Sequence, residues 1–249
     1  MIEPMIWVVL FSLLGSVGAV ACAGLLLVFP EAVRTRLLPA LLSYATGTLL
    51  GAAFLGMLPK SLEQAPPLAV TATVLAGIVA FFLLEKLVLW RHCHEADCEV
   101  HSHQGGTLIL VGDAFHNFVD GIVIAAAFLT SLPMGIATTL AVIAHEIPQE
   151  LGDFAILLDG GFARAKAMRY NLLSSLSTLP GALIGWFWLD EVRQAIPYVL
   201  ATSAASFIYI AVADLVPGLH RQTSLNATAR QTVLILCGIG TIAFIRFGA

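Results

Sequence analysis

Eight long apolar runs divide this chain from one end to the other. Each has roughly the 20 residues that a helix needs to cross a bilayer. The runs lie near 5–29, 38–59, 67–90, 107–131, 133–158, 171–189, 196–216 and 231–247. Only 11% of the 249 residues are charged, whereas an average soluble domain has about 25%. The sequence therefore predicts an integral membrane protein.

The length and continuity of the runs predict helices rather than strands. A backbone surrounded by lipid must satisfy its own hydrogen bonds, which restricts it to helices or closed barrels, and a barrel segment has about 10 residues. The connections are too short for a separate soluble domain. The first run, preceded by no Lys or Arg, is expected to be a retained helix rather than a cleaved signal. We expect an all-α integral membrane protein with eight transmembrane helices in a single transmembrane domain, 1–249.

Basic residues near the ends of the runs predict the orientation, because cytoplasmic loops carry the excess of Lys and Arg. One side holds only Lys60, Arg193 and Arg246. The other side, after the first, third, fifth and seventh runs, holds Arg34, Arg36, Arg91, Arg164, Lys166, Arg169, Arg221 and Arg230. This asymmetry predicts an N-out and C-out arrangement.

The first three runs (5–90) and the last three (171–247) start on opposite sides of the membrane, as in inverted repeats around a central pair. A weak similarity joins AAFLGMLP, which ends at Pro59, to ASFIYIAVADLVP, which ends at Pro217. We expect a 3+2+3 inverted-repeat bundle, although this short match could also arise by chance. The central pair, 107–158, carries the unusual residues.

A loop rich in His and Cys, RHCHEADCEVHSHQGG (91–106), precedes the fourth run and is assigned to the cytosol, where thiols stay reduced. Such density of His and Cys favours weak binding of a soft or borderline metal. The spacing matches no closed tetrahedral site, so a polar loop without a metal role is the alternative. The residues concerned are His92, Cys93, His94, Cys98, His101 and His103.

Polar residues form one stripe on the run at 107–131. Asp113, His116 and Asp120 recur at i, i+3 and i+7, which places them on one face of a helix, and Asn117 adjoins them. Ionisable groups at this depth cost about 3 kcal/mol or more unless they are paired, hydrated or bound to an ion. The stripe therefore predicts a polar partner on a neighbouring helix.

The run at 133–158 supplies that partner in the stretch HEIPQELGDF (145–154). Within an arc of about 140° it presents His145, Glu146, Gln149, Glu150 and Asp153. Nitrogen and oxygen ligands of this kind suit zinc and similar divalent cations. The excess of acids over bases favours a bound cation over the alternative, a buried polar network that only joins two helices.

The motif is one residue short of HExxH, because Gln149 stands where a zinc protease has its second His. An intramembrane zinc metalloprotease with Glu146 as the base remains an alternative function. Pro148 lacks an N–H, so the helix is expected to kink beside the polar residues and to leave room for water.

HNFVDG (116–121) and HEIPQELGDF resemble the paired motifs of the ZIP (Zrt/Irt-like) family of divalent metal transporters. The resemblance covers all eight runs and implies metal influx into the cytosol through a site between the fourth and fifth helices, with a His-rich loop before the fourth. By motif position it implies ligands at His116, Asn117, Asp120, His145, Glu146 and Gln149.

Some positions depart from the family pattern. Related proteins have a second His or a bridging Glu where Gln149 stands, and some have a metal-binding Glu at the position of Thr178. Polar residues of the second helix are replaced by Ala53 and Gly56. We therefore expect one principal transport site. Its predicted ligands are His116, Asp120, His145 and Glu146, with Asn117, Gln149 and Glu150 as further contacts and Asp113 in helix orientation or proton movement.

The predicted function is transport of divalent cations, with zinc preferred, by alternating access; a broader carrier of iron, manganese, cadmium or cobalt is a further alternative. The metal is substrate rather than cofactor, and no enzymatic activity is expected. The expected partners are metal ions and the lipid bilayer, with a homodimer as one option and no nucleic acid. The predicted location is the plasma (inner) membrane, as a multi-pass protein.

Overall fold

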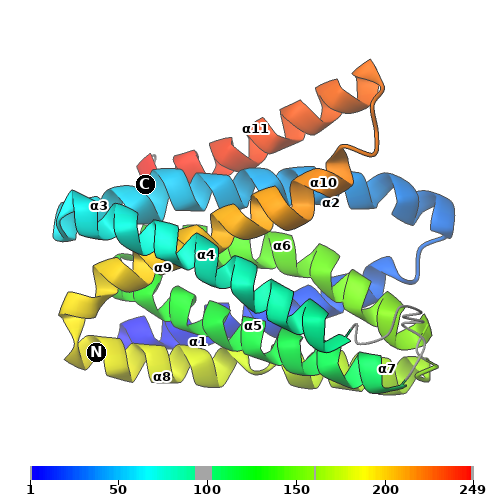
Figure 1. Ribbon diagram of the computed structural model, residues 1–249, viewed down its shortest axis with the longest axis horizontal. Helices are drawn as coiled ribbons and strands as arrows, with labels where there is room; N and C mark the ends of the chain where they lie inside the picture. The colour runs from blue at the N-terminus through cyan, green and yellow to red at the C-terminus, as the bar shows by residue number, and fades with distance from the viewer. Residues whose placement is uncertain (1, 93–102, 160, 248–249) are drawn as a thin grey trace.

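The computed structural model describes residues 2–92, 103–159 and 161–247 (Figure 1). Within these ranges the chain is helical apart from short connections and has no strand, which confirms the all-α prediction. Most of the predicted His/Cys loop, 93–102, lies outside the described residues. In chain order the elements are α1 (Ile2–Leu26), α2 (Glu31–Gly51), η1 (Ala52–Met57), α3 (Leu58–Gln64), α4 (Pro67–His92), α5 (His103–Thr130), α6 (Leu132–Asp159), α7 (Arg164–Ser175), α8 (Thr178–Glu191), η2 (Arg193–Ala195), α9 (Ile196–Tyr209), η3 (Ile210–Leu215), α10 (Val216–Leu219) and α11 (Leu225–Phe247).

Seven helical stretches in the described part of the chain are long and apolar enough to cross a membrane. The predicted run that is missing from this set is the fifth, 133–158, which corresponds to α6, whose 28 residues would measure about 42 Å. Its second half carries His145, Glu146, Gln149 and Glu150, which lower its hydropathy and keep it out of that set. The seven stretches are Met5–Leu26, Arg36–Gln64, Pro67–Leu84, Leu110–Thr130, Arg164–Leu189, Arg193–Leu219 and Leu225–Phe247.

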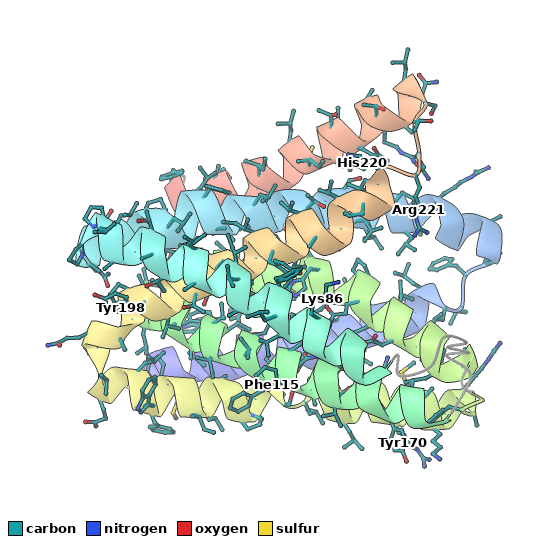
Figure 2. All side chains as sticks on the ribbon, in the orientation of Figure 1. Lys86, Phe115, Tyr170, Tyr198, His220 and Arg221 are labelled. Carbon is teal, nitrogen blue, oxygen red and sulfur yellow. The ribbon has the colours of Figure 1, made fainter. Side chains whose placement is uncertain are left out.

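Apolar side chains cover much of the outer surface, as expected of a protein that faces lipid (Figure 2). Phe115 on α5 is 57% exposed, and Phe187 and Trp188 on α8 are 61% and 56% exposed. Soluble monomers seldom expose extended apolar patches. The surface therefore agrees with the multi-pass membrane protein that the helix lengths indicate.

The predicted span at 171–189 is longer in the structure and is divided in two. The helical path begins at Arg164 and is interrupted at 176–177, between α7 and α8. Hydroxyl groups at this break bond to carbonyl oxygens: Ser174 donates to Asn171, and Ser177 donates to Ala114 of α5. Such side-chain bonds compete with the helix backbone, and a hydrophobicity pattern does not reveal them.

Two six-residue π-helices interrupt corresponding places in the second and seventh spans. η1 ends immediately before Leu58-Pro59, and η3 ends immediately before Val216-Pro217. Proline has no N–H and clashes with the preceding turn, so a widened turn upstream is a known accommodation. The two π-helices lie in the two segments whose sequences are weakly similar. That similarity therefore has a structural counterpart.

The helices pack as two groups, seen one above the other in Figure 1. One group contains α1, α5, α6, α7 and α8, and the other contains α2, α4, α9 and α11 with their short extensions. The groups meet chiefly where α2 lies against α6. Both termini lie at the same end of the bundle (Figure 1).

Glycine allows α5 and α8 to touch backbone to backbone. A Cβ at Gly121 of α5 would lie 2.0 Å from the carbonyl oxygen of Thr178, and a Cβ at Gly181 of α8 would lie 2.0 Å from that of Phe118. Small residues at helix contacts are the usual means of close approach in membranes. This contact fixes α8 beside the polar stripe of α5.

Candidate metal site

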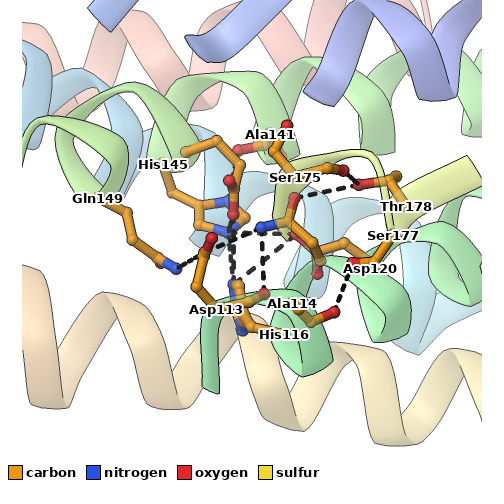
Figure 3. A network of polar contacts seen from close by, with 12 residues as sticks. Asp113, Ala114, His116, Asp120, Ala141, His145, Gln149, Ser175, Ser177 and Thr178 are labelled. Atoms are coloured by element: carbon orange, nitrogen blue, oxygen red, sulfur yellow. Dashed lines mark hydrogen bonds and ion pairs between the residues drawn. The ribbon is translucent and has the colours of Figure 1, made fainter. Parts of the chain in front are cut away.

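The two polar arcs predicted from the sequence meet between α5 and α6 (Figure 3). His116 and Asp120 come from α5, one helical turn apart, and His145 and Glu146 come from α6. One ligand atom from each of the four residues lies within 4.8 Å of the others. The structure thus brings together the four residues predicted to form the principal site.

The distances in this cluster match those of a tetrahedral ligand set. The Nε2 atoms of His116 and His145 are 3.2 Å apart, and each lies 3.4 Å from Glu146 Oε1. Asp120 Oδ2 lies 3.4 Å from His145 Nε2 and 3.8 Å from His116 Nε2. Bonds of about 2.1 Å to a tetrahedral zinc place ligand atoms about 3.4 Å apart. The four side chains therefore fit a zinc-sized ion with little rearrangement.

The carboxylates of the cluster are buried, and their ion-pair partners in the described part of the chain are the two histidines rather than Lys or Arg. Asp120 is 1% exposed and Glu146 is 0% exposed. Among the described residues, Asp120 Oδ2 and both oxygens of Glu146 have no hydrogen-bond donor. The sequence contains no Lys or Arg between Thr107 and Leu158. Buried charges need pairing or a metal, so this cluster is suited to a cation.

The ring of His145 is oriented by its own helix. Its Nδ1 lies 3.0 Å from the carbonyl oxygen of Ala141. A carbonyl can only accept, so Nδ1 carries the proton, and in the neutral ring Nε2 has the lone pair that faces the cluster. This is the usual arrangement of a metal-binding histidine, in which the second ring nitrogen is held by a carbonyl or carboxylate.

The predicted contacts Asn117 and Gln149 bind other side chains instead of completing the cluster. Asn117 donates to Asp113 Oδ1 at 2.9 Å and accepts from Thr178 Oγ1 at 3.0 Å. Gln149 donates to the same oxygen of Asp113 at 3.3 Å. The helical spacing predicted the face of each residue but could not indicate which neighbour its amide would bind.

Glu150, predicted as a further contact, lies beside the four-residue cluster rather than in it. It is fully buried and groups with Asp113 and Glu146, rather than with the two histidines. The sequence predicts a role for Asp113 in helix orientation or proton movement but does not predict this grouping. The signal was present in the spacing, since Glu150 follows Glu146 by one helical turn and Asp113 precedes His116 by one.

A cavity of about 320 Å³ reaches His145 between α2, α6 and η3. Its walls include Pro148 and Gln149 on α6 and Ile210 and Leu215 on η3. α6 continues through Pro148 as one helix, and the room for water predicted beside that proline is present. An ion in the cluster would therefore adjoin a space at the border of the two helix groups.

A family of known transporters matches most of this chain. The family model described as ZIP Zinc transporter matches residues 91–246. The chain is 35% identical to zinc transporter ZIP13 of Pongo abelii, over 92% of this chain and 75% of that protein. It is 29% identical to zinc transporter zipt-7.2 of Caenorhabditis elegans, over 94% and 64%. Human zinc transporter ZIP10 is 37% identical, but the match covers 51% of this chain and 17% of ZIP10.

Proposed function

The chain belongs to the ZIP zinc transporter family, and we propose that it carries divalent metal ions, with zinc preferred, across a membrane into the cytosol. The observation that carries this proposal is the buried cluster of His116, Asp120, His145 and Glu146 between two membrane helices. Two imidazoles and two carboxylates suit zinc better than a ligand set of oxygen alone. The relatives named above are zinc transporters, which supports the same substrate.

The prediction that the chain is not an enzyme agrees with its membership of a transporter family. The geometry also argues against the protease alternative. The position of the second HExxH histidine is occupied by Gln149, whose amide donates to Asp113 rather than facing the cluster. The ion is therefore treated as the transported substrate.

The arrangement supports alternating access, in which one helix group rocks against the other around a fixed site. All four ligands belong to α5 and α6, which lie in the same group. The cavity beside His145 has walls from both groups, because α6 belongs to one and η3 to the other. Relative movement of the groups would therefore open or close this space without dismantling the ligand set.

We further propose that α6 also crosses the membrane, which brings the number of spans to eight, and that both termini face outward in the plasma (inner) membrane. Arg164, Lys166, Arg169 and Arg221 are exposed and follow α6 or α10, at the end assigned to the cytosol by the excess of basic residues. We expect short peptide tags at either terminus to be removed by protease added outside intact cells. Tags that resist cleavage until the cells are lysed would contradict this orientation.

Zinc uptake by proteoliposomes tests the function directly. Vesicles that contain the purified chain should accumulate radioactive zinc faster than empty vesicles. Asp120→Ala should lower uptake at least about 10-fold, since it removes a charged ligand. Glu191→Gln, which changes an exposed carboxylate at the end of α8, serves as the control and should transport normally. Competition by iron, manganese, cadmium and cobalt will rank the substrates, and equal uptake by protein-containing and empty vesicles would refute the proposal.

A further inference from the structure

We infer that an anionic phospholipid binds in a pocket between α1, α6 and α7, at the end of the bundle proposed to face the cytosol. The pocket has a volume of about 580 Å³, within the usual range for small-molecule sites, roughly 300–1,000 Å³. None of the lining residues that the structure describes belongs to the metal cluster, so the inference goes beyond the proposed transport. The walls include Leu27 and Val28 after α1, Phe154 and Leu158 on α6, and Arg164 and Met168 on α7.

The pocket lies beside the surface that faces lipid. α1 ends at Leu26, α6 ends at Asp159 and α7 begins at Arg164, so three helix ends meet at one end of the bundle (Figure 1). Leu25 and Val28 are exposed, which continues the apolar outer surface to the rim of the pocket. Membrane lipid can therefore reach the pocket from the side.

The inner wall of the pocket is apolar and belongs to a small core of its own. Phe154, Leu158 and Met168 pack in a hydrophobic cluster that also contains Phe162. Gly24 on α1 lets Met168 come close, since a Cβ at Gly24 would lie 2.9 Å from the Cε atom of Met168. Such a wall suits a hydrocarbon chain rather than a soluble anion, which would lose hydration there without gaining polar partners.

Positive charge surrounds the exposed side of the pocket. Arg164 lines it and is exposed, and Lys166 and Arg169 are exposed on the same helix. The first turn of α7 reads RAKA and contains no acid. Lys166 Nζ lies 5.0 Å from the centre of the Phe162 ring and 5.6 Å from that of Tyr170. These contacts hold the ammonium group at this surface.

The combination of charge and apolar wall indicates the class of ligand. A guanidinium group binds a phosphate through two parallel hydrogen bonds, and basic pockets between membrane helices on the cytosolic side bind anionic lipid headgroups. Arg164 would bind the phosphate while an acyl chain lies along Phe154, Leu158 and Met168. A zwitterionic lipid offers the same chain but carries a compensating positive charge, so it should bind less tightly.

The lipid would join helices of the group that carries the metal ligands. α6 holds His145 and Glu146, and α1 and α7 pack against it. Asn171 of α7 also donates to the carbonyl oxygen of Glu150 at 3.2 Å. A ligand that binds only the folded protein stabilises it, so bound lipid should hold α1, α6 and α7 together as a unit.

Native mass spectrometry of the purified full chain tests the inference. Protein washed free of lipid in detergent is titrated with phosphatidylglycerol or with phosphatidylcholine of the same acyl chains. We expect phosphatidylglycerol to bind at least about 5-fold more tightly, which is the effect of one basic side chain beside an anionic headgroup. Arg164→Gln should lower the affinity for phosphatidylglycerol about 5-fold without changing that for phosphatidylcholine, and Arg164→Lys should bind both lipids like the wild type.

Two further variants separate the pocket from general surface charge. Ala165 lines the pocket and is exposed, so Ala165→Trp should fill the pocket without disturbing the core. It should weaken both lipids at least about 10-fold, since each buried methylene group contributes about 4-fold and an indole displaces several. Arg221→Gln changes an exposed basic residue that follows α10 (Figure 2) and should bind both lipids like the wild type. Size-exclusion chromatography confirms that each variant is folded.

Thermal stability gives a second measurement. Saturating phosphatidylglycerol should raise the melting temperature of the wild type by about 5 °C or more, whereas inorganic phosphate should not. The inference is overturned by equal binding of the two lipids, by phosphatidylglycerol binding that is unchanged in folded Arg164→Gln or Ala165→Trp, or by equal stabilisation with inorganic phosphate. These measurements contain no zinc, so a failure of zinc uptake would contradict the proposed function and leave the lipid site standing.

Discussion

Replacing His145 by alanine is expected to lower zinc uptake by proteoliposomes more than about 100-fold, because loss of an orienting partner alone commonly costs about 10–100-fold in metal affinity. His145 is 1% exposed and contributes a nitrogen that lies within 3.4 Å of Asp120, Glu146 and the other histidine. Its removal leaves two buried carboxylates with a single imidazole. The reduced ligand set should neither select zinc nor compensate for the ion's lost hydration.

His220→Ala is the matched control for this measurement. His220 is exposed at the end of α10 (Figure 2), away from the cluster between α5 and α6. Its replacement should leave uptake within about 2-fold of the wild type, since exposed substitutions usually change stability by less than about 0.5 kcal/mol. Equal uptake by His145→Ala and the wild type, at equal amounts of folded protein, would mean that the cluster is not the transport site.

Gly121→Ala is expected to destabilise the bundle by about 3 kcal/mol, at the upper end of typical overpacking costs. A Cβ at this position would lie 2.0 Å from the carbonyl oxygen of Thr178 and 2.6 Å from the amide nitrogen of Ala182. Both are backbone atoms, so no side-chain rotation relieves the clash and α8 must move away. The melting temperature should fall by roughly 6–12 °C for a chain of this size.

Gly112→Ala provides the comparison on the same helix. A Cβ at Gly112 meets nothing within 4 Å among the described residues, and alanine favours a helix over glycine by about 0.5–1 kcal/mol. This variant should melt at or slightly above the wild-type temperature, measured by loss of the monodisperse chromatographic peak after heating. If both variants melt together, the close contact between α5 and α8 does not stabilise the fold as described.

Hydrophobicity was sufficient to predict most of the fold, because the cost of placing backbone polar groups in lipid leaves few alternatives to a helix. The interruption between α7 and α8 was not predictable in the same way. It depends on Ser177 reaching the backbone of α5, a contact between residues that are far apart in the sequence. The two π-helices likewise depend on how a helix accommodates Pro59 and Pro217, and hydropathy carries no information about that.

The candidate site was predictable to the level of the helical face but not of the individual contact. The spacing of His116 and Asp120 on one run, and of His145 and Glu146 on another, placed four side chains that the structure brings together. Glu150 shares that face, yet its position along the helix groups it with Asp113 instead. Helical periodicity predicts the side of a helix on which a residue lies. A metal site also depends on which residues of two packed helices lie at the same height along the bundle.

The hydrogen bond within α6 has a consequence for how the protein moves. The proton on His145 Nδ1 is held by Ala141, four residues earlier on the same helix, rather than by a residue of another helix. Any rigid displacement of α6 therefore carries the imidazole and its partner together. The tautomer that binds metal does not have to be re-established in each conformation, so His145 can present the same lone pair to the ion throughout a transport cycle.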